Sequence, residues 1–142
     1  MPHATHRDAM DRKIDEHFSF EARDDIDGVL ATLTPDVDHD IVGWPTGPTR
    51  GRDGARSFYQ TLFADLTDGR ITCLKRLYGD DFLVDESLWQ GVANGRPFGL
   101  EGRDRKLAFR LLHVIEFAGS GDIKRENVWV DLAAIMQQLP QS

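Results

Sequence analysis

The sequence has a single cysteine, Cys73, in a chain of 142 residues. One thiol cannot form a disulfide within the chain and cannot supply a cysteine-based zinc site. The sequence also has no apolar run near the ~20 residues that span a bilayer. Its first residues lack the apolar core of a secretion signal. We therefore expect a cytoplasmic protein that has no membrane partner.

Basic residues are in short supply: 17 Lys and Arg stand against 24 Asp and Glu, and the formal net charge is -7. Because phosphate backbones need a positive protein surface, nucleic acid is excluded as an expected partner. Hydrophobic residues make up 40% of the chain, too many for a disordered protein. The length predicts one domain over residues 1–142, with residues 1–7 as a flexible lead-in.

The spacing of apolar residues changes from helical to strand-like near residue 67. Before that point, a period near 3.6 predicts a helix over 8–22, a short helix after Asp25 that Pro35 ends, and a helix from Asp53 to Leu66. Alternation predicts one early strand, over 36–44. A loop follows it, and Asp68 and Gly69 are expected to form a turn. Beyond this turn the pattern predicts four antiparallel strands and a short last helix from Asp131, with the strands over 70–78, 82–93, 105–118 and 122–130.

Segregated helices and strands are typical of the α+β class. We therefore expect a cone-shaped, curved, mixed or antiparallel sheet wrapped around the N-terminal helices. The concave face of such a sheet is the natural place for an apolar pocket with a few polar groups. On the longest strand one face is apolar except for a histidine, with Leu107, Phe109, Leu111, His113, Ile115 and Phe117 in alternation.

Histidines on apolar faces are more often hydrogen-bonded core residues than catalytic ones. His113 is one such residue, and His17 in the apolar stripe of the first helix is another. Glu86 and Trp89 lie on opposite faces of their strand, so only one of them can face the pocket. A catalytic role is favoured over a core role only where several such residues meet at one cavity.

Two segments carry a family resemblance: LATLTPDVDHDIVGWPTGPTRGRDGARSFYQTLF (30–63) and HVIEFAGSGDIKRENVWVDLAAIMQQL (113–139). They contain a strand that ends in a His-Asp pair, a Gly-Arg-Asp-Gly helix start, a Phe-turn-Gly hairpin, and a Trp and an Asp near the last strand. In this order the features resemble the SnoaL-like polyketide cyclases of the nuclear transport factor 2-like superfamily. The resemblance covers most of the chain and implies a cystatin-like, nuclear transport factor 2-like fold.

The resemblance also implies catalytic residues. The Δ5-3-ketosteroid isomerases are distantly similar, and their pocket holds a strand aspartate that moves a proton and two donors that stabilise an enolate oxygen. Against that pattern Asp40 falls at the aspartate, and His17 and His113 fall at the two donors. The polyketide cyclases place an acid/base aspartate on the last strand; here Asn127 occupies the matching position and Asp131 lies four residues further, so either could replace it. The epoxide hydrolases of this superfamily carry Arg-x-Asp where Leu111 and His113 stand, which disfavours epoxide hydrolysis.

These implications define two expected functions. The first is a cofactor-independent enzyme without a metal, an aldol-type cyclase or an isomerase (lyase or isomerase class), that moves a proton α to a carbonyl in a small apolar substrate. The alternative is a non-catalytic module that binds a small ligand or serves in assembly. Besides the catalytic residues, we expect these to bind the substrate: His39, Trp44, Phe58, Phe109, Leu111, Asn127, Trp129 and Asp131.

Aliphatic residues are also expected on the outer face of the sheet, turned away from the helices. Exposed apolar patches on a sheet are typical of a partner-binding surface. Relatives of this fold commonly pair through this face, so the resemblance implies a homodimer. The residues expected there are Leu112, Val114, Val128 and Val130.

Overall fold

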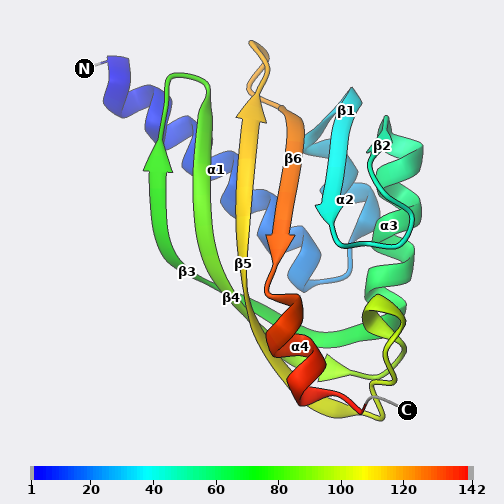
Figure 1. The fold of residues 1–142 in the computed structure, drawn as a ribbon. Coiled ribbons are helices and arrows are strands. Elements are labelled where there is room, and N and C mark those ends of the chain that lie inside the picture. The colour runs from blue at the N-terminus through cyan, green and yellow to red at the C-terminus, as the bar shows by residue number, and fades with distance from the viewer. Residues whose placement is uncertain (1, 141–142) are drawn as a thin grey trace.

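A six-stranded, curved sheet forms the body of the molecule, in the strand order β2-β1-β6-β5-β4-β3 (Figure 1). The computed structural model describes residues 2–140, with side chains from residue 6 onward. β1 runs parallel to β6, whereas all other neighbouring strands are antiparallel. The expected α+β class and mixed sheet are therefore confirmed. The strands are β1 (Leu33–Val42), β2 (Thr49–Arg50), β3 (Leu66–Tyr78), β4 (Phe82–Ala93), β5 (Arg105–Phe117) and β6 (Ile123–Val130).

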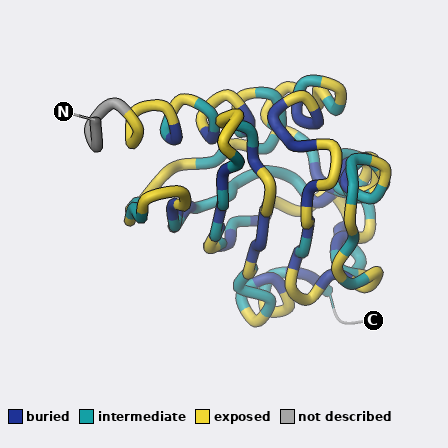
Figure 2. Tube along the Cα trace, turned by 90° about the horizontal axis from the view of Figure 1, so that it is seen from above, coloured by how far each residue is buried: buried dark blue, intermediate teal, exposed yellow. Residues whose placement is uncertain are grey.

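The helices α1 (Pro2–Ala22), α2 (Ile26–Ala31) and α3 (Arg52–Asp65) lie over one face of the sheet, as Figures 1 and 2 show. The helix α4 (Leu132–Gln138) and the 3-10 turn η1 (Pro97–Gly99) lie near the narrow end. The lead-in expected over residues 1–7 is helical from residue 2, and residue 1 lies outside the described part. None of the described helices is both long and apolar enough to cross a membrane.

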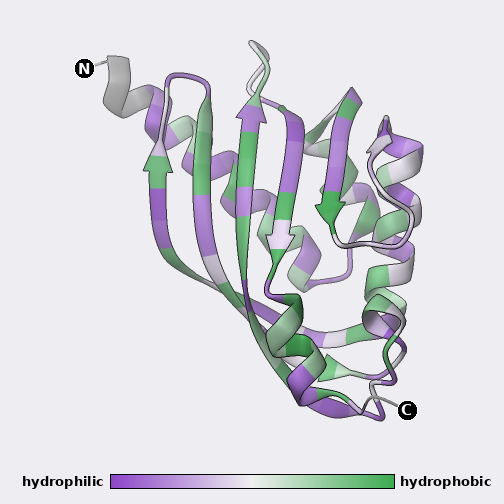
Figure 3. Ribbon diagram, viewed as in Figure 1, coloured by the Kyte–Doolittle hydropathy of each residue, from purple (hydrophilic) through white to green (hydrophobic). Residues whose placement is uncertain are grey.

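The core fills the space between these helices and the concave face of the sheet. Met10, Ile14 and His17 are buried at the i, i+4 and i+7 positions of α1, so one face of that helix packs inward. Most of β5 is green in Figure 3, and burial alternates along it, with Leu107, Phe109, His113, Ile115 and Phe117 buried, as expected for a strand with one face in the core. A second apolar cluster, which includes Ile135 and Leu139, joins α4 to the narrow end of the sheet.

Two expected boundaries are wrong. Pro35 does not end α2, because the chain has already entered β1, where Leu33 pairs with Ile123. Pro35 is tolerated there because the pairing with β6 is irregular between Leu33 and Asp38, so its missing N–H removes no regular ladder bond. Asp68 and Gly69 form no turn either: they lie within β3 at an irregularity of its pairing with β4, and Asp68 has a φ of 54°. The short strand β2 lies in the segment that was expected to be a loop.

The last strand contains a β-bulge that the alternation pattern did not reveal. Phe117 pairs with Ile123, whereas the neighbouring Glu116 pairs with Arg125, so β6 has one extra residue, Lys124. An extra residue exchanges the two faces of the strand beyond it. Glu126, Val128 and Val130 therefore face inward.

Candidate functional site

A cavity of about 90 Å³ lies between the concave face of the sheet and the helices α1 and α3. Its wall is mostly aromatic and aliphatic. Five of the expected site residues line it, namely Trp44, Phe58, Phe109, Leu111 and His113. Trp89 lines it as well, which decides between the two candidates on β4, because Glu86 lies on the other face near Arg110.

His113 is backed by a buried carboxylate. Its Nδ1 lies 3.3 Å from Oδ1 of Asp85, the residue opposite it on β4. Asp85 is fully buried. A carboxylate in this position favours a proton on Nδ1 and leaves Nε2 of His113 as the ring nitrogen available to a ligand.

The charge on Asp85 is itself compensated by three groups. The Ser87 hydroxyl donates to Oδ1, and the Arg76 Nε donates to Oδ2 at 2.7 Å. Burial alone would raise the pKa of Asp85, but its contacts with His113, Ser87 and Arg76 outweigh burial and hold it well below its ordinary value. Asp85 therefore stays ionised at neutral pH.

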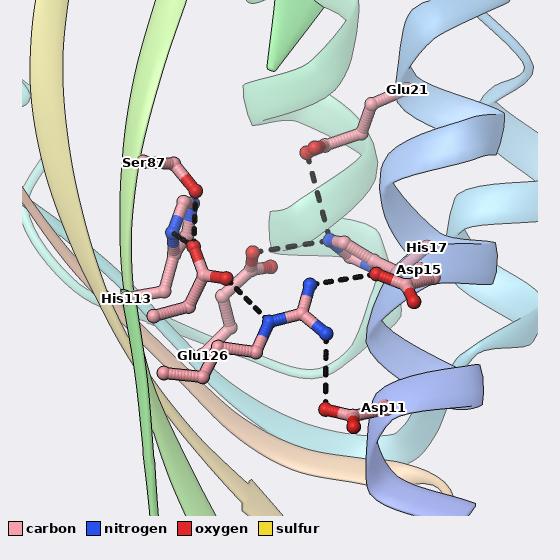
Figure 4. A network of polar contacts seen from close by, with 9 residues as sticks. Asp11, Asp15, His17, Glu21, Ser87, His113 and Glu126 are labelled. Carbon is pink, nitrogen blue, oxygen red and sulfur yellow. Dashed lines mark hydrogen bonds and ion pairs between the residues drawn. The ribbon is translucent and has the colours of Figure 1, made fainter. Parts of the chain in front are cut away.

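Arg76 is held in turn by the first helix. Its two terminal nitrogens donate to Asp11 at 3.0 Å and to Asp15 at 2.6 Å (Figure 4). Its bonds to Asp15 and Asp85 keep the pKa of Arg76 above its ordinary value even though burial acts to lower it. A chain of charges thus runs from the surface of α1 to the ring of His113.

A second polar cluster surrounds Glu126, which is almost fully buried on β6. Its Oε2 lies 3.1 Å from Nε2 of His17, and its Oε1 accepts a hydrogen bond from the Tyr59 hydroxyl at 2.9 Å. His39 Nε2 lies 3.2 Å from Oε1. Glu21 lies 3.6 Å from Nε2 of His17 on its other side (Figure 4).

The hydrogen bonds in this cluster determine where the protons are. The Thr32 hydroxyl donates to the carbonyl of Val29 at 2.6 Å, so it accepts from Nδ1 of His17 at 2.7 Å. The Tyr59 proton goes to Glu126. His17 Nε2 then faces two carboxylates and carries a proton too, which makes the ring an imidazolium.

The pKa shifts agree with this assignment. Burial acts to lower the pKa of His17, but the charges of Glu126 and Glu21 outweigh burial and raise it to about 10. Burial would raise the pKa of Glu126, yet His17 and His39 hold it well below its ordinary value. Burial and the neighbouring Glu126 raise the pKa of Tyr59 well above 10.0, so its hydroxyl stays neutral.

The same cluster is the one place in the described part of the chain where several ligand atoms could hold a metal ion. Donor atoms of His17, Glu21 and Glu126 lie within 4.8 Å of one another. In the present arrangement the single positive charge of His17 faces both carboxylates, Glu126 at 3.1 Å and Glu21 at 3.6 Å.

Asp40 is not brought to the cavity, and this corrects the expectation that the three catalytic candidates meet there. It lies on the opposite face of β1 from the buried His39 and Ile41, and Asn127 Nδ2 donates to its backbone carbonyl at 3.5 Å. His17 does not line the cavity itself but acts on Glu126, which does.

Four residues expected to bind substrate also lie outside the cavity wall. Because of the bulge in β6, Asn127 and Trp129 are on the other face from Glu126, and Trp129 is 42% exposed. Asp131 caps α4 by accepting from the backbone of Ala134 at 3.1 Å. His39 faces inward but lies behind the wall, against the ring of Phe58.

The sequence reasoning missed the carboxylates that do reach the interior. Asp85 alternates with Leu83 and Ser87 on β4, and Glu126 alternates with two valines on β6. A lone carboxylate on an otherwise apolar strand face was the available signal for both. Tyr59 was not among the expected site residues either, because a tyrosine hydroxyl leaves no trace in the helical periodicity of residues 53–66.

The family model described as SnoaL-like polyketide cyclase matches residues 9–139. A protein from Jannaschia sp. CCS1, described as a SnoaL-like polyketide cyclase, has a similar structure, with a TM-score of 0.82, 15% identity, and coverage of 94% of this chain and 93% of that one. TsrD from Streptomyces laurentii gives a TM-score of 0.80 at 17% identity over 93% of this chain and 95% of its own. No curated protein matches the chain. Since the model spans nearly the whole sequence, the chain belongs to the SnoaL-like polyketide cyclase family.

Proposed function

We propose that this protein is a cofactor-independent enzyme of the cyclase or isomerase type that moves a proton α to a carbonyl group. The observation that carries the proposal is a histidine in an apolar cavity wall, backed by a buried and ionised carboxylate. His113 and Asp85 form this pair. Family membership supports a cyclase-type reaction, and the pair supports proton transfer as its chemistry.

His113 is the proposed base. Its Nε2 takes the proton from the carbon next to the carbonyl, and the electron pair of the broken C–H bond moves into an enolate. The ring then carries two protons and a positive charge, which Asp85 stabilises at 3.3 Å. The proton returns to another carbon in an isomerisation. In a ring closure the enolate attacks a second carbonyl, and the alkoxide formed there takes the proton from His113.

The enolate oxygen needs a hydrogen-bond donor, and Tyr59 is the group that fits. It lines the cavity, and its raised pKa keeps the hydroxyl protonated at neutral pH. The single proton of the hydroxyl goes to Glu126 in the free protein, and in this proposal it turns to the enolate oxygen when substrate binds. Glu126 and His17 hold the hydroxyl oxygen in place, so both are positioning residues. In this proposal Tyr59, which His17 contacts, has the donor role that was expected of His17.

The enclosed volume limits the substrate. The cavity of about 90 Å³ is smaller than the ~300–1,000 Å³ of sites for drug-sized ligands. We therefore propose a substrate whose buried part is a small ring or chain.

Deuterium exchange tests the proposal without knowledge of the natural substrate. Small ketones such as cyclopentanone and cyclohexanone are incubated with the protein in D₂O, and loss of the α-proton signal is followed by NMR. Exchange above the buffer rate is expected for the wild type. His113→Gln keeps a polar group beside Asp85 but removes the base, so the catalysed rate should fall ~10²–10⁴-fold.

Asp40→Asn is the matched control, because it removes a carboxylate from the opposite face of β1. Its exchange rate should equal that of the wild type. A loss in Asp40→Asn with normal exchange in His113→Gln would assign the base to Asp40 instead. A wild-type protein that binds these ketones without exchange would indicate the non-catalytic binding module.

A further inference from the structure

We propose that the cavity takes a ligand with a substituted ammonium group, that is, a nitrogen cation carrying several alkyl groups. The inference rests on the proposed function only in naming this ligand as the substrate. Its binding can be measured without any turnover.

The charged groups around the cavity are mostly acidic. Glu21, Asp24 and Glu126 line it, and none of the lining residues in the described part of the chain is a lysine or an arginine. The imidazolium of His17 lies against Glu126 and 3.6 Å from Glu21, so a single positive charge faces two of these three carboxylates. The Asp85 beside His113 has its own partner in Arg76. A cationic ligand would balance the remaining negative charge.

The end of the first helix adds to this field. α1 is 21 residues long and ends at Ala22, and both Ala22 and the exposed Asp24 line the cavity. The C-terminal end of a helix carries a partial negative charge, which favours a nearby cation. The exposed Asp24 and this helix end therefore form a negative entrance.

Aromatic rings supply the complementary surface. Trp44 packs edge-on against Phe58 at 4.8 Å and Phe98 at 5.1 Å, and Trp89 stacks on Phe109 at 5.2 Å. The face of an aromatic ring, tryptophan above all, attracts a cation. Both cation–π contacts among the described residues lie elsewhere, on Tyr78 and Phe20. Among the described residues, no lysine or arginine thus lies over a ring of the cavity.

The polar groups favour a substituted over a primary ammonium. Three N–H donors of a primary ammonium would each need an acceptor. The two oxygens of Glu126 already face Tyr59, His39 and His17. A nitrogen covered by methyl groups has few or no N–H donors to satisfy, and its apolar surface suits a wall of rings.

A cationic substrate would also help the proposed chemistry. The reaction creates an enolate in a cavity that already holds carboxylates, and like charges at close range oppose its formation. A positive nitrogen in the same molecule lowers that cost. The carboxylates of the cavity thus favour a cationic ligand, and the charge of that ligand in turn favours enolate formation.

Two probes of nearly equal shape test the inference. Choline and 3,3-dimethylbutan-1-ol differ in that a quaternary nitrogen replaces a quaternary carbon. Their dissociation constants are measured by calorimetry, and by fluorescence of Trp44 and Trp89. Choline should bind at least about tenfold more tightly than the neutral alcohol. Equal affinity, tighter binding of the alcohol, or no binding of choline would overturn the inference.

Two variants then test which carboxylate contributes to choline binding. Glu21→Gln should weaken choline binding about tenfold and leave the alcohol unchanged. Glu86→Gln makes the same change in charge on the outer face of β4 and should affect neither probe. An equal effect of the two variants would mean that only net charge matters and would overturn the inference. Choline preference without ketone exchange refutes the proposed function alone, and exchange without choline preference refutes this inference alone.

Discussion

The ion pair between His17 and Glu126 makes the stability of this protein depend on pH in a defined window. The folded pKa of His17, about 10, lies above its ordinary 6.5, so folding holds a proton that the unfolded chain releases. This stabilisation is complete below about pH 6.5 and is lost as the pH rises toward 10. Urea denaturation should show the free energy of unfolding falling by about 2–3 kcal/mol between pH 7 and pH 9.

Glu126→Gln supplies the control for that measurement. Without the carboxylate, burial dominates and the pKa of His17 falls, so most of the slope between pH 7 and pH 9 should disappear. The variant should also be less stable at pH 7 by about 3–5 kcal/mol, because the buried ion pair that stabilises the folded protein at that pH is broken. A slope that survives in Glu126→Gln would assign the pH dependence to other groups.

Arg76 connects three elements, since it lies on β3 and binds Asp85 on β4 and Asp11 and Asp15 on α1. Arg76→Ala leaves the buried Asp85 without its main counter-charge. We expect a loss of about 3–5 kcal/mol in the free energy of unfolding, measured by urea denaturation at pH 7. Arg70→Ala on the same strand removes only an exposed hydrogen bond to Gln90 and should cost under about 1 kcal/mol. Similar losses in the two variants would contradict this role.

The loop 94–104 holds Phe98 against Trp44 at the cavity. A Cβ on Gly102 would collide with the backbone carbonyl of Ala93, so only glycine fits there without a shift of the chain. Gly102→Ala should lower stability by about 1–3 kcal/mol and make the loop a site of early proteolysis. Gly119→Ala is the control, because a Cβ there meets nothing within 4 Å. Equal proteolysis rates in the two variants would show that the loop tolerates the change.

Element by element, the sequence predicts the fold well where periodicity is strong. The alternation on β5 placed Phe109 and His113 correctly toward the interior, and Asp131 was correctly placed at the start of the last helix. The bounds of α2 and β1 were missed because long-range pairing of Leu33 with Ile123 overrides the local effect of Pro35.

The site was less predictable than the fold, because a bulge changes which residues of β6 face inward and because one key contact joins two different strands. The bulge at Lys124 reverses the faces of β6, so Trp129 was expected inside and Glu126 was overlooked. Asp40 follows the buried His39 on β1 and so lies on the other face, although the resemblance to the isomerases implied a catalytic role for it. The pairing of Asp85 with His113 depends on the register between two strands, which no local pattern encodes.

At the scale of the whole molecule, the outer face of the sheet carries an apolar patch in register across three strands. Val42 pairs with Trp129, which pairs with Leu112, and they are 37%, 42% and 38% exposed. Val128 and Val130, which were expected there, line the cavity instead. We propose that this patch forms the contact of a homodimer.

Light scattering tests that dimer. The wild type should have about twice the mass of the 16.0 kDa chain at micromolar concentration. Trp129→Asp places a charge in the centre of the patch and should give the monomer mass. Leu77→Asp, at an exposed position of β3, should remain dimeric. A wild-type mass near that of one chain would refute the proposed contact.

The parallel pairing of β1 with β6 has a consequence for synthesis on the ribosome. β1 is complete at Val42, but the strand beside it begins at Ile123, so about 80 residues separate the two along the chain. At roughly 5–20 residues per second, on the order of 4–16 s pass before β6 emerges. During that time one edge of β1 lacks its native neighbour, and Glu126 has not yet reached the ring of His17. Newly made chains are therefore most exposed to aggregation and most dependent on chaperones in this interval.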